Sequence, residues 1–150
     1  MVNQGYFGIG IYHSKNSINI GTLWRSANIF GASFIFTIGR RYKRQSSDTM
    51  KTPLNIPLFE FNTFDNFKSF LPKFARLVAI EITESAQDLR NYCHHEQTVY
   101  LLGAEDTGIP EEILHKCHDI IKIPGNYCLN VSTAGSIVMY DRLIKKTDNK

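Results

Sequence analysis

Short runs of apolar residues alternate along this chain with segments whose apolar positions recur every three or four residues. The runs, rich in β-branched and aromatic residues, predict buried strands at residues 8–12, 33–39, 57–61, 77–82, 98–103 and 119–123. The segments between them predict helices at residues 19–30, 64–71, 85–92, 110–117 and 129–145. Because strands and helices alternate, we expect one α/β domain over residues 1–150, with a mostly parallel sheet flanked by helices.

The first predicted helix lies in the stretch NIGTLWRSANIFGA, residues 19–32, and has a single cation in an apolar setting. Asn19 is a favourable N-cap residue, and Gly31 stands where a helix often ends in a left-handed residue. The apolar positions form one face that we expect to be buried: Ile20, Leu23, Trp24, Ala27 and Phe30. Arg25 falls on the opposite side and is expected to point outward.

Charge and cysteine content narrow the choice of partners and compartment. The net charge is only +3, but cations gather in two segments: Arg40, Arg41, Lys43, Arg44 and Lys51, and then Arg142, Lys145, Lys146 and Lys150. Such segments suit phosphate backbones, and a solvated loop and a frayed tail are the alternative interpretation.

The three cysteines are an odd number without disulfide-like spacing, and no membrane span or signal peptide is visible, so we expect a cytoplasmic protein without a membrane partner.

Two familiar kinds of site are not supported by their context. The glycines of GYFGIGIYHS, residues 5–14, lie before and inside a strand, whereas a dinucleotide fingerprint needs them in the turn that opens a helix. The histidines and cysteines form no closed set of four zinc ligands: Cys93, His94 and His95, and then His115, Cys117 and His118. We therefore expect ordinary surface histidines and no metal.

Three stretches carry the chemical signal. The first is the helix that contains Arg25; the second is LLGAEDTGIP, residues 101–110; the third is IKIPGNYCLNVSTAGSIVMYDRL, residues 121–143. In the second and third stretches a buried strand ends in a turn of glycines and small polar residues. Ligands of parallel α/β sheets bind beyond the carboxyl ends of strands, where these turns lie.

In this order and at these intervals, the three stretches resemble the motifs of the SpoU (TrmH-type) branch of the SPOUT RNA methyltransferases. The resemblance extends from Ile9 to about Leu143. The positions that match the three family motifs are Asn19 and Arg25; Gly103, Glu105 and Gly108; and Ile123, Pro124, Leu129, Asn130 and Ser132.

The resemblance implies a fold and an activity. Its fold would be the SPOUT fold, a mostly parallel sheet whose C-terminal end forms a deep trefoil knot, which would make this chain an exception to the usual connection rules. The knot would bind S-adenosylmethionine, and the protein would be a homodimer. The expected reaction is methylation of a ribose 2′-hydroxyl in tRNA or rRNA, with tRNA favoured by the small size of the chain. The alternative is a catalytically idle SPOUT subunit that binds RNA, whereas methylation of a base nitrogen would be expected to use motifs of other SPOUT branches.

The same resemblance assigns a cofactor pocket to five residues, namely Ile80, Gly103, Ile123, Cys128 and Leu129. Gly103 would allow close backbone approach, and Ile123 and Leu129 would form apolar walls. Many relatives have a serine where this chain has Cys128. Because a thiol is the weaker hydrogen-bond donor, any contact that this serine makes is in doubt here.

The expected catalytic residues are Arg25, Glu105 and Asn130. A guanidinium stays protonated, so we favour Arg25 as a clamp for the substrate phosphate rather than as the general base. Glu105 would orient Arg25 or cap nearby backbone N–H groups, and Asn130 would tie the knot loop together at the start of the last helix; a purely structural role is open for both. The expected RNA-binding residues are Asn19, Arg25, Arg40, Arg41, Lys43 and Arg44.

Overall fold

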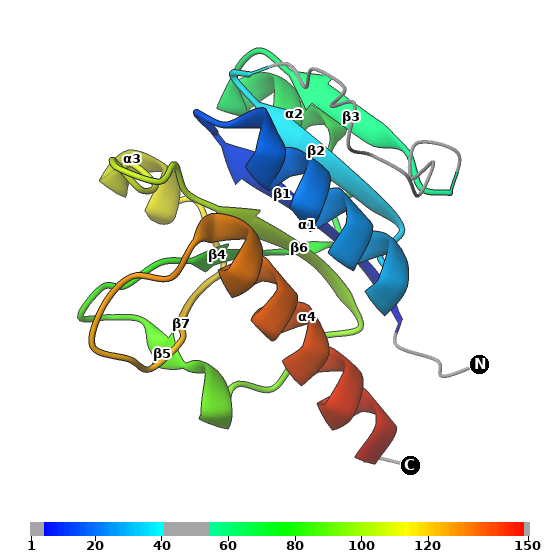
Figure 1. Cartoon of the computed structure of the whole chain (residues 1–150), viewed down its shortest axis with the longest axis vertical. Helices are drawn as coiled ribbons and strands as arrows, with labels where there is room; N and C mark the ends of the chain where they lie inside the picture. The colour runs from blue at the N-terminus through cyan, green and yellow to red at the C-terminus, as the bar shows by residue number, and fades with distance from the viewer. Residues whose placement is uncertain (1–4, 41–54, 149–150) are drawn as a thin grey trace.

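The computed structural model describes residues 5–40 and 55–148, and the strands of this part of the chain form one parallel sheet (Figure 1). The strands are β1 (Tyr6–Tyr12), β2 (Phe34–Ile38), β3 (Leu58–Phe61), β4 (Arg76–Ile80), β5 (Gln87–Asp88), β6 (Gln97–Leu102) and β7 (Asp119–Lys122). Their order across the sheet is β3-β2-β1-β6-β4-β7-β5. The helices are α1 (Ser17–Phe30), α2 (Phe64–Phe70), α3 (Glu111–Leu114) and α4 (Val131–Asp148), with a short 3₁₀ turn, η2 (Leu89–Asn91). The predicted α/β class with a parallel sheet is confirmed.

The sheet is covered on both faces, which explains why its strands are apolar throughout. Helices α1 and α4 lie side by side on one face, as Figure 1 shows, and pack on alternate residues of β1 such as Ile9 and Ile11. Helices α2 and α3 cover the other face, where Phe36 stacks on Phe67 with ring centroids 4.4 Å apart. Two apolar layers therefore hold the sheet, and the ends of its strands are left for function.

The glycines of β1 serve packing. A Cβ atom on Gly8 would come within 2.3 Å of the Phe34 ring, and one on Gly10 within 2.3 Å of the Phe36 carbonyl oxygen. The absent side chains therefore make room for phenylalanines from β2, a recognised use of glycine inside a strand. This packing role explains why glycines recur in the strand at GYFGIGIYHS, where the context does not fit a dinucleotide site.

Helix α1 begins earlier than predicted, and the predicted N-cap at Asn19 is wrong. Asn16 caps the helix by accepting a hydrogen bond from the Ile18 N–H, while Asn19 lies buried within the first turns. Asn16 and Asn19 both fit the sequence pattern of an N-cap. Asn19 is not the cap because its side chain makes the contacts described below. Gly31 ends the helix with φ 84°, as predicted.

The segment at residues 85–92 is not the helix that its composition predicted. It contains the two-residue strand β5, whose Gln87 and Asp88 pair with β7, followed by η2. The open edge of β7 offered backbone partners, and a segment this short had no strong helical preference to set against them. The helix predicted at residues 110–117 is likewise shorter, since α3 ends at Leu114.

Helix α4 is fastened to the amino end of β6 by residues that the sequence placed in a basic tail. The Arg142 side chain is fully buried, lies 5.0 Å from the centre of the Phe7 ring, and donates hydrogen bonds to the carbonyl oxygens of His95 and Glu96. The Lys145 ammonium donates to two further carbonyl oxygens, of Leu89 and Tyr92. Interpreting these two cations as phosphate contacts is therefore wrong, because both are used to dock the helix.

His94 belongs to the same anchor and is buried, so the prediction of a surface histidine here is wrong. Its ring lies between the Tyr100 hydroxyl, 2.6 Å from Nδ1, and the Asp141 carboxylate, 2.8 Å from Nε2. Burial lowers the pKa of His94 to about 4, and the neighbouring carboxylate only partly opposes this shift. The imidazole is thus neutral at physiological pH.

Among the described residues, no helix combines the length and the apolar character needed to cross a membrane.

Candidate functional site

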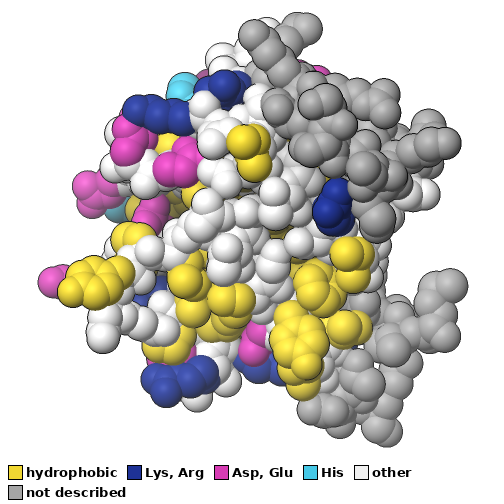
Figure 2. Space-filling model, viewed as in Figure 1, with side chains coloured by type: hydrophobic (Ala, Val, Ile, Leu, Met, Phe, Trp, Pro, Cys, Tyr) yellow, Lys and Arg dark blue, Asp and Glu magenta, His cyan; other side chains and the backbone are white. Residues whose placement is uncertain are grey.

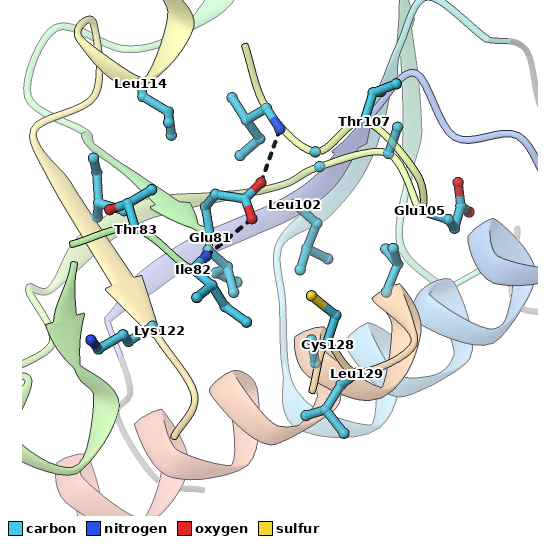
Figure 3. Close-up of a pocket in the computed structure, with 18 of the residues that line it drawn as sticks. Glu81, Ile82, Thr83, Leu102, Glu105, Thr107, Leu114, Lys122, Cys128 and Leu129 are labelled. Carbon is cyan, nitrogen blue, oxygen red and sulfur yellow. Dashed lines mark hydrogen bonds between the residues drawn. The ribbon is translucent and has the colours of Figure 1, made fainter. Parts of the chain in front are cut away.

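A cavity of about 750 Å³ opens at the carboxyl ends of β4, β6 and β7, the edge at which the sequence predicted a ligand (Figure 3). This volume is in the range of pockets that hold small organic ligands. Its walls come from the ends of those strands, from the loop at residues 103–109 and from the loop at residues 123–130. The structure brings together at this cavity all five residues predicted for a cofactor: Ile80, Gly103, Ile123, Cys128 and Leu129.

The loop after β6 is folded so tightly that it needs glycine at Gly103. Ala104 and Gly108 form an isolated antiparallel bridge, which turns the chain back on itself. A Cβ atom on Gly103 would lie 2.6 Å from the carbonyl carbon of Gly108, closer than real Cβ contacts occur. Glycine at this position therefore allows the two sides of the turn to lie against each other, and the turn forms one wall of the cavity.

Glu81 is a cavity residue that the sequence analysis missed. One carboxylate oxygen accepts from the Ile82 N–H at 3.0 Å and the other from the Ile109 N–H at 2.9 Å, as Figure 3 shows. The side chain thereby joins the end of β4 to the loop after β6. The available signal is a lone acid inside the apolar run LVAIEI, residues 77–82, which the pattern predicts as a strand.

Asn19, Glu105 and Asn130 form a hydrogen-bonded bridge beside the cavity. The Asn19 amide donates to Glu105 at 2.6 Å, and the Asn130 amide donates to the Asn19 oxygen at 3.0 Å. Glu105 and Asn130 line the cavity, while Asn19 is buried in α1. The bridge links the loops that follow β6 and β7 to the first turns of α1.

The two alternatives left open for Glu105 are separated by its contacts. Its carboxylate accepts from the Lys15 backbone N–H at 3.1 Å and from the Ser14 hydroxyl at 3.2 Å. Burial tends to raise the pKa of Glu105, but the hydrogen bonds from Asn19, Lys15 and Ser14 outweigh it and hold the pKa below the ordinary 4.5. Glu105 thus caps local donors as an ionised group, and the structure shows no contact from it to Arg25.

Asn130 joins the cavity loop to the start of α4. Its side-chain oxygen accepts from the Ser132 N–H and the Ser132 hydroxyl, at 3.0 and 2.6 Å, and from the Thr133 N–H at 3.3 Å. The amide nitrogen of the same side chain reaches Asn19. One residue therefore caps α4 and binds α1 at the same time.

The remaining predicted residues lie around the cavity or outside the described part of the chain. Arg25 is exposed on α1, does not line the cavity, and makes no hydrogen bond or ion pair with the described residues. The Arg40 guanidinium donates to the carbonyl oxygen of Lys15. Three further expected RNA contacts lie outside the described residues: Arg41, Lys43 and Arg44.

The charge around the cavity is mostly negative, and its outer loop is exposed. The cavity walls carry more acidic side chains than basic ones, since Lys122 is the lysine among the lining residues. The acidic residues are Glu81, Glu105, Asp106 and Glu111. Cys128 is exposed, and Figure 3 shows its sulfur turned into the pocket. Within the described residues, no group of three or more histidine, cysteine, aspartate or glutamate side chains is arranged to hold a metal ion.

Comparison with known proteins agrees with this arrangement. A family model described as the SpoU rRNA Methylase family matches residues 7–140. The chain is 25% identical over 136 residues to the tRNA (guanosine(18)-2′-O)-methyltransferase TARBP1 of Mus musculus, which covers 82% of this chain and 8% of that protein. The chain therefore spans only a small part of this curated relative.

Solved structures share the fold. An AdoMet-bound rRNA methyltransferase from Sinorhizobium meliloti superposes with a TM-score of 0.78 at 24% identity, covering 92% of this chain and 56% of that one. A structure concerned with the 2-OH methylation of C/U34 on tRNA gives 0.79 at 24% identity, covering 97% and 99%. A TrmH/SpoU tRNA modifying enzyme from A. aeolicus gives 0.83 at 20% identity, covering 95% and 76%.

Proposed function

Because the chain belongs to the SpoU rRNA methylase family, we propose that it transfers a methyl group from S-adenosylmethionine to a ribose 2′-hydroxyl of tRNA or rRNA. The observation that carries this proposal is the cavity itself. It stands at the strand ends, has a glycine turn as one wall, and is tied through Asn19 to the helix that presents Arg25. A curated relative and a solved neighbour are described as tRNA 2′-hydroxyl methylating proteins, which favours tRNA.

The residues at the cavity fit an adenosyl group with a charged methionine tail. The turn at residues 103–108 forms one wall of the cavity, and its backbone N–H and C=O groups can meet a purine edge. Ile80, Ile123 and Leu129 supply apolar surface for the ring, and the acidic walls suit a cation. When bound, the group would supply a methyl already activated on a sulfonium, so the protein needs no metal for that step.

The protein's own contribution is alignment. The ribose oxygen must approach the methyl carbon in line, and holding two reactants in that geometry is a large source of rate enhancement. We assign this to Arg25, whose exposed guanidinium can grip the phosphate next to the target ribose bidentately. Glu105 and Asn130 hold Asn19, and through it α1, against the cavity loops. The proton of the hydroxyl then passes to the phosphate or to water, since a guanidinium is a poor base.

We further propose that the protein is a single-domain homodimer with a C-terminal trefoil knot, working in the cytoplasm. The dimer is supported by large apolar side chains exposed on α1 and α4, the face that Figure 2 shows with hydrophobic side chains gathered over both helices. They are Ile18, Ile29, Ile137, Tyr140 and Ile144. The knot is supported by family membership and by strand order, because β6 and β7 insert on either side of β4 before α4 returns to α1.

The test is methyl transfer from labelled S-adenosylmethionine to total tRNA and total rRNA, followed by nucleoside mapping. We expect a 2′-O-methylated nucleoside, and we expect Arg25→Ala to lower the rate by about 100-fold because the acceptor is no longer aligned. Calorimetric binding of S-adenosylhomocysteine should be unchanged in this variant. Lys68→Ala, an exposed cation of α2 across the sheet, is the matched control and should methylate normally.

Three results would count against the proposal. Undiminished transfer by the Arg25 variant would remove Arg25 from the mechanism. Tight RNA binding without any transfer would favour the idle RNA-binding subunit, and a methylated base would show another class of acceptor.

A further inference from the structure

His13, directly after β1, has a strained backbone. Its φ is 52°, and among the described residues it is the non-glycine residue with a positive φ. This conformation is unfavourable for a residue that carries a side chain. Such strain persists where surrounding contacts enforce it, and it concentrates at functional sites.

Three contacts enforce this conformation. The His13 N–H donates to the Ile38 carbonyl oxygen at 2.8 Å, and the imidazole stacks on Tyr12 with centroids 4.1 Å apart and planes 22° apart. The third contact is with Gly39, where a Cβ atom would lie 2.4 Å from His13 Nε2. The ring is therefore seated between Tyr12 and a bare stretch of backbone, in a fixed position.

The fixed ring is nevertheless unused by the fold. His13 is exposed, and its ring nitrogens make no hydrogen bond or ion pair with the described residues. Arg40 follows Gly39 immediately and turns its guanidinium towards the Lys15 carbonyl oxygen, two residues after His13. The imidazole lies against Gly39 and the guanidinium belongs to the next residue, so the two groups of donors lie on adjoining segments of the chain.

The segment that follows His13 is bonded to a residue of the cavity wall. The two residues after His13 both contact Glu105, through the Ser14 hydroxyl and the Lys15 N–H, and Glu105 lines the cavity. Helix α1, which presents Arg25, begins four residues after His13.

We propose that His13 is an RNA-contacting residue, which together with Arg40 holds a backbone phosphate of the substrate RNA at the rim of the cavity; this rests on the proposed function. Phosphate oxygens are the acceptors that imidazole and guanidinium donors prefer in protein–RNA contacts, and such contacts fix the register of the nucleic acid. A rigid donor does this at a small entropic cost, which is a reason to retain the strain.

The test uses His13→Gly, because glycine accepts a positive φ and so removes the ring while relieving the strain. His13→Asn, which also tolerates this backbone, is the second variant. We expect RNA affinity, measured by filter binding of labelled total tRNA and total rRNA with S-adenosylhomocysteine present, to fall by about tenfold in both. Unfolding temperatures should stay within a few degrees of the wild type. His95→Asn, an exposed histidine at the amino edge of the sheet, should bind RNA normally.

The outcomes separate this inference from the proposed function. Wild-type protein that methylates RNA, with His13 variants that bind RNA as tightly as it does, would overturn the RNA contact and leave the activity standing. Wild-type protein that neither binds nor methylates tRNA or rRNA would overturn both. Weakened RNA binding with unchanged S-adenosylhomocysteine binding supports the contact at His13.

Discussion

At the scale of single residues, the site depends on side chains that satisfy backbone groups. Glu81 and Glu105 together accept hydrogen bonds from the backbone N–H groups of Ile82, Ile109 and Lys15. Asn130 caps α4 in the same way. Because loops have few regular hydrogen bonds of their own, these carboxylates and amides give the cavity loops a defined shape.

Glu105→Gln should lower the free energy of unfolding by about 1 kcal/mol near neutral pH, since an amide nitrogen would face a donor that the carboxylate now accepts from. The folded pKa of Glu105 lies below 4.5, so its stabilising effect is complete above that pH and is lost as the pH falls through the folded value. Urea unfolding of both proteins from pH 7 to pH 3 measures this, and their difference should narrow in acid. Glu84→Gln, an exposed acid on the neighbouring loop, is the control; equal stability of wild type and Glu105→Gln at pH 7 would contradict the expectation.

At the scale of elements, α4 is fixed to the rest of the molecule at two places, its beginning and its middle. Asn130 fixes its beginning to α1, and Arg142 with His94 and Asp141 fixes its middle to the amino end of β6. Because the same helix follows directly from the cavity loop, the anchor at β6 also limits how far that loop can move.

The anchor should make stability fall in mild acid. His94 has a folded pKa of about 4 against 6.5 in an ordinary histidine, so the unfolded chain binds the extra proton first. Stability is therefore complete above pH 6.5 and declines by up to about 3 kcal/mol as the pH falls to about 4. His94→Gln, which does not titrate, should flatten this part of a urea-unfolding profile. His115→Gln, an exposed histidine, should keep the wild-type profile; an unchanged slope in His94→Gln would show that the decline has another source.

Sequence periodicity predicted the elements with strong patterns and failed on weak ones. The apolar runs of β1, β2, β4 and β6 were long enough to decide their own state. The pattern at residues 85–92 was too short to fix its secondary structure, and pairing with the open edge of β7 made part of it a strand. Asn19 was misassigned as a cap because its partner, Glu105, lies 86 positions away. Glu81 was missed for the same reason, since its contact with Ile109 exists only in the folded chain.

At the scale of the whole molecule, the apolar side chains exposed on α1 and α4 form a surface that a partner molecule would bury. Soluble monomers seldom leave large apolar patches in water, and a second copy of this face would bury them by two-fold symmetry. The Tyr140 ring, 53% exposed, lies 6.1 Å from the Phe30 ring, so residues of both helices contribute.

Tyr140→Glu should convert the proposed homodimer to a monomer, because a carboxylate would be buried at the proposed interface without a partner. Analytical ultracentrifugation measures the change, and circular dichroism should show an intact fold. Phe74→Glu places the same charge on an exposed aromatic position away from α1 and α4, and it should remain dimeric. A dimeric Tyr140→Glu protein would place the interface elsewhere.

The bond between Asn130 and Asn19 has a consequence for how the molecule forms. It joins residues 111 positions apart, and the bond from Asn19 to Glu105 spans 86. Closing such large loops costs chain entropy that only later contacts repay, which slows folding. Helices and the pairing of β1 with the nearby β2 can therefore precede the pocket, and a refolding chain should regain part of its spectroscopic signal before it regains the capacity to bind a ligand.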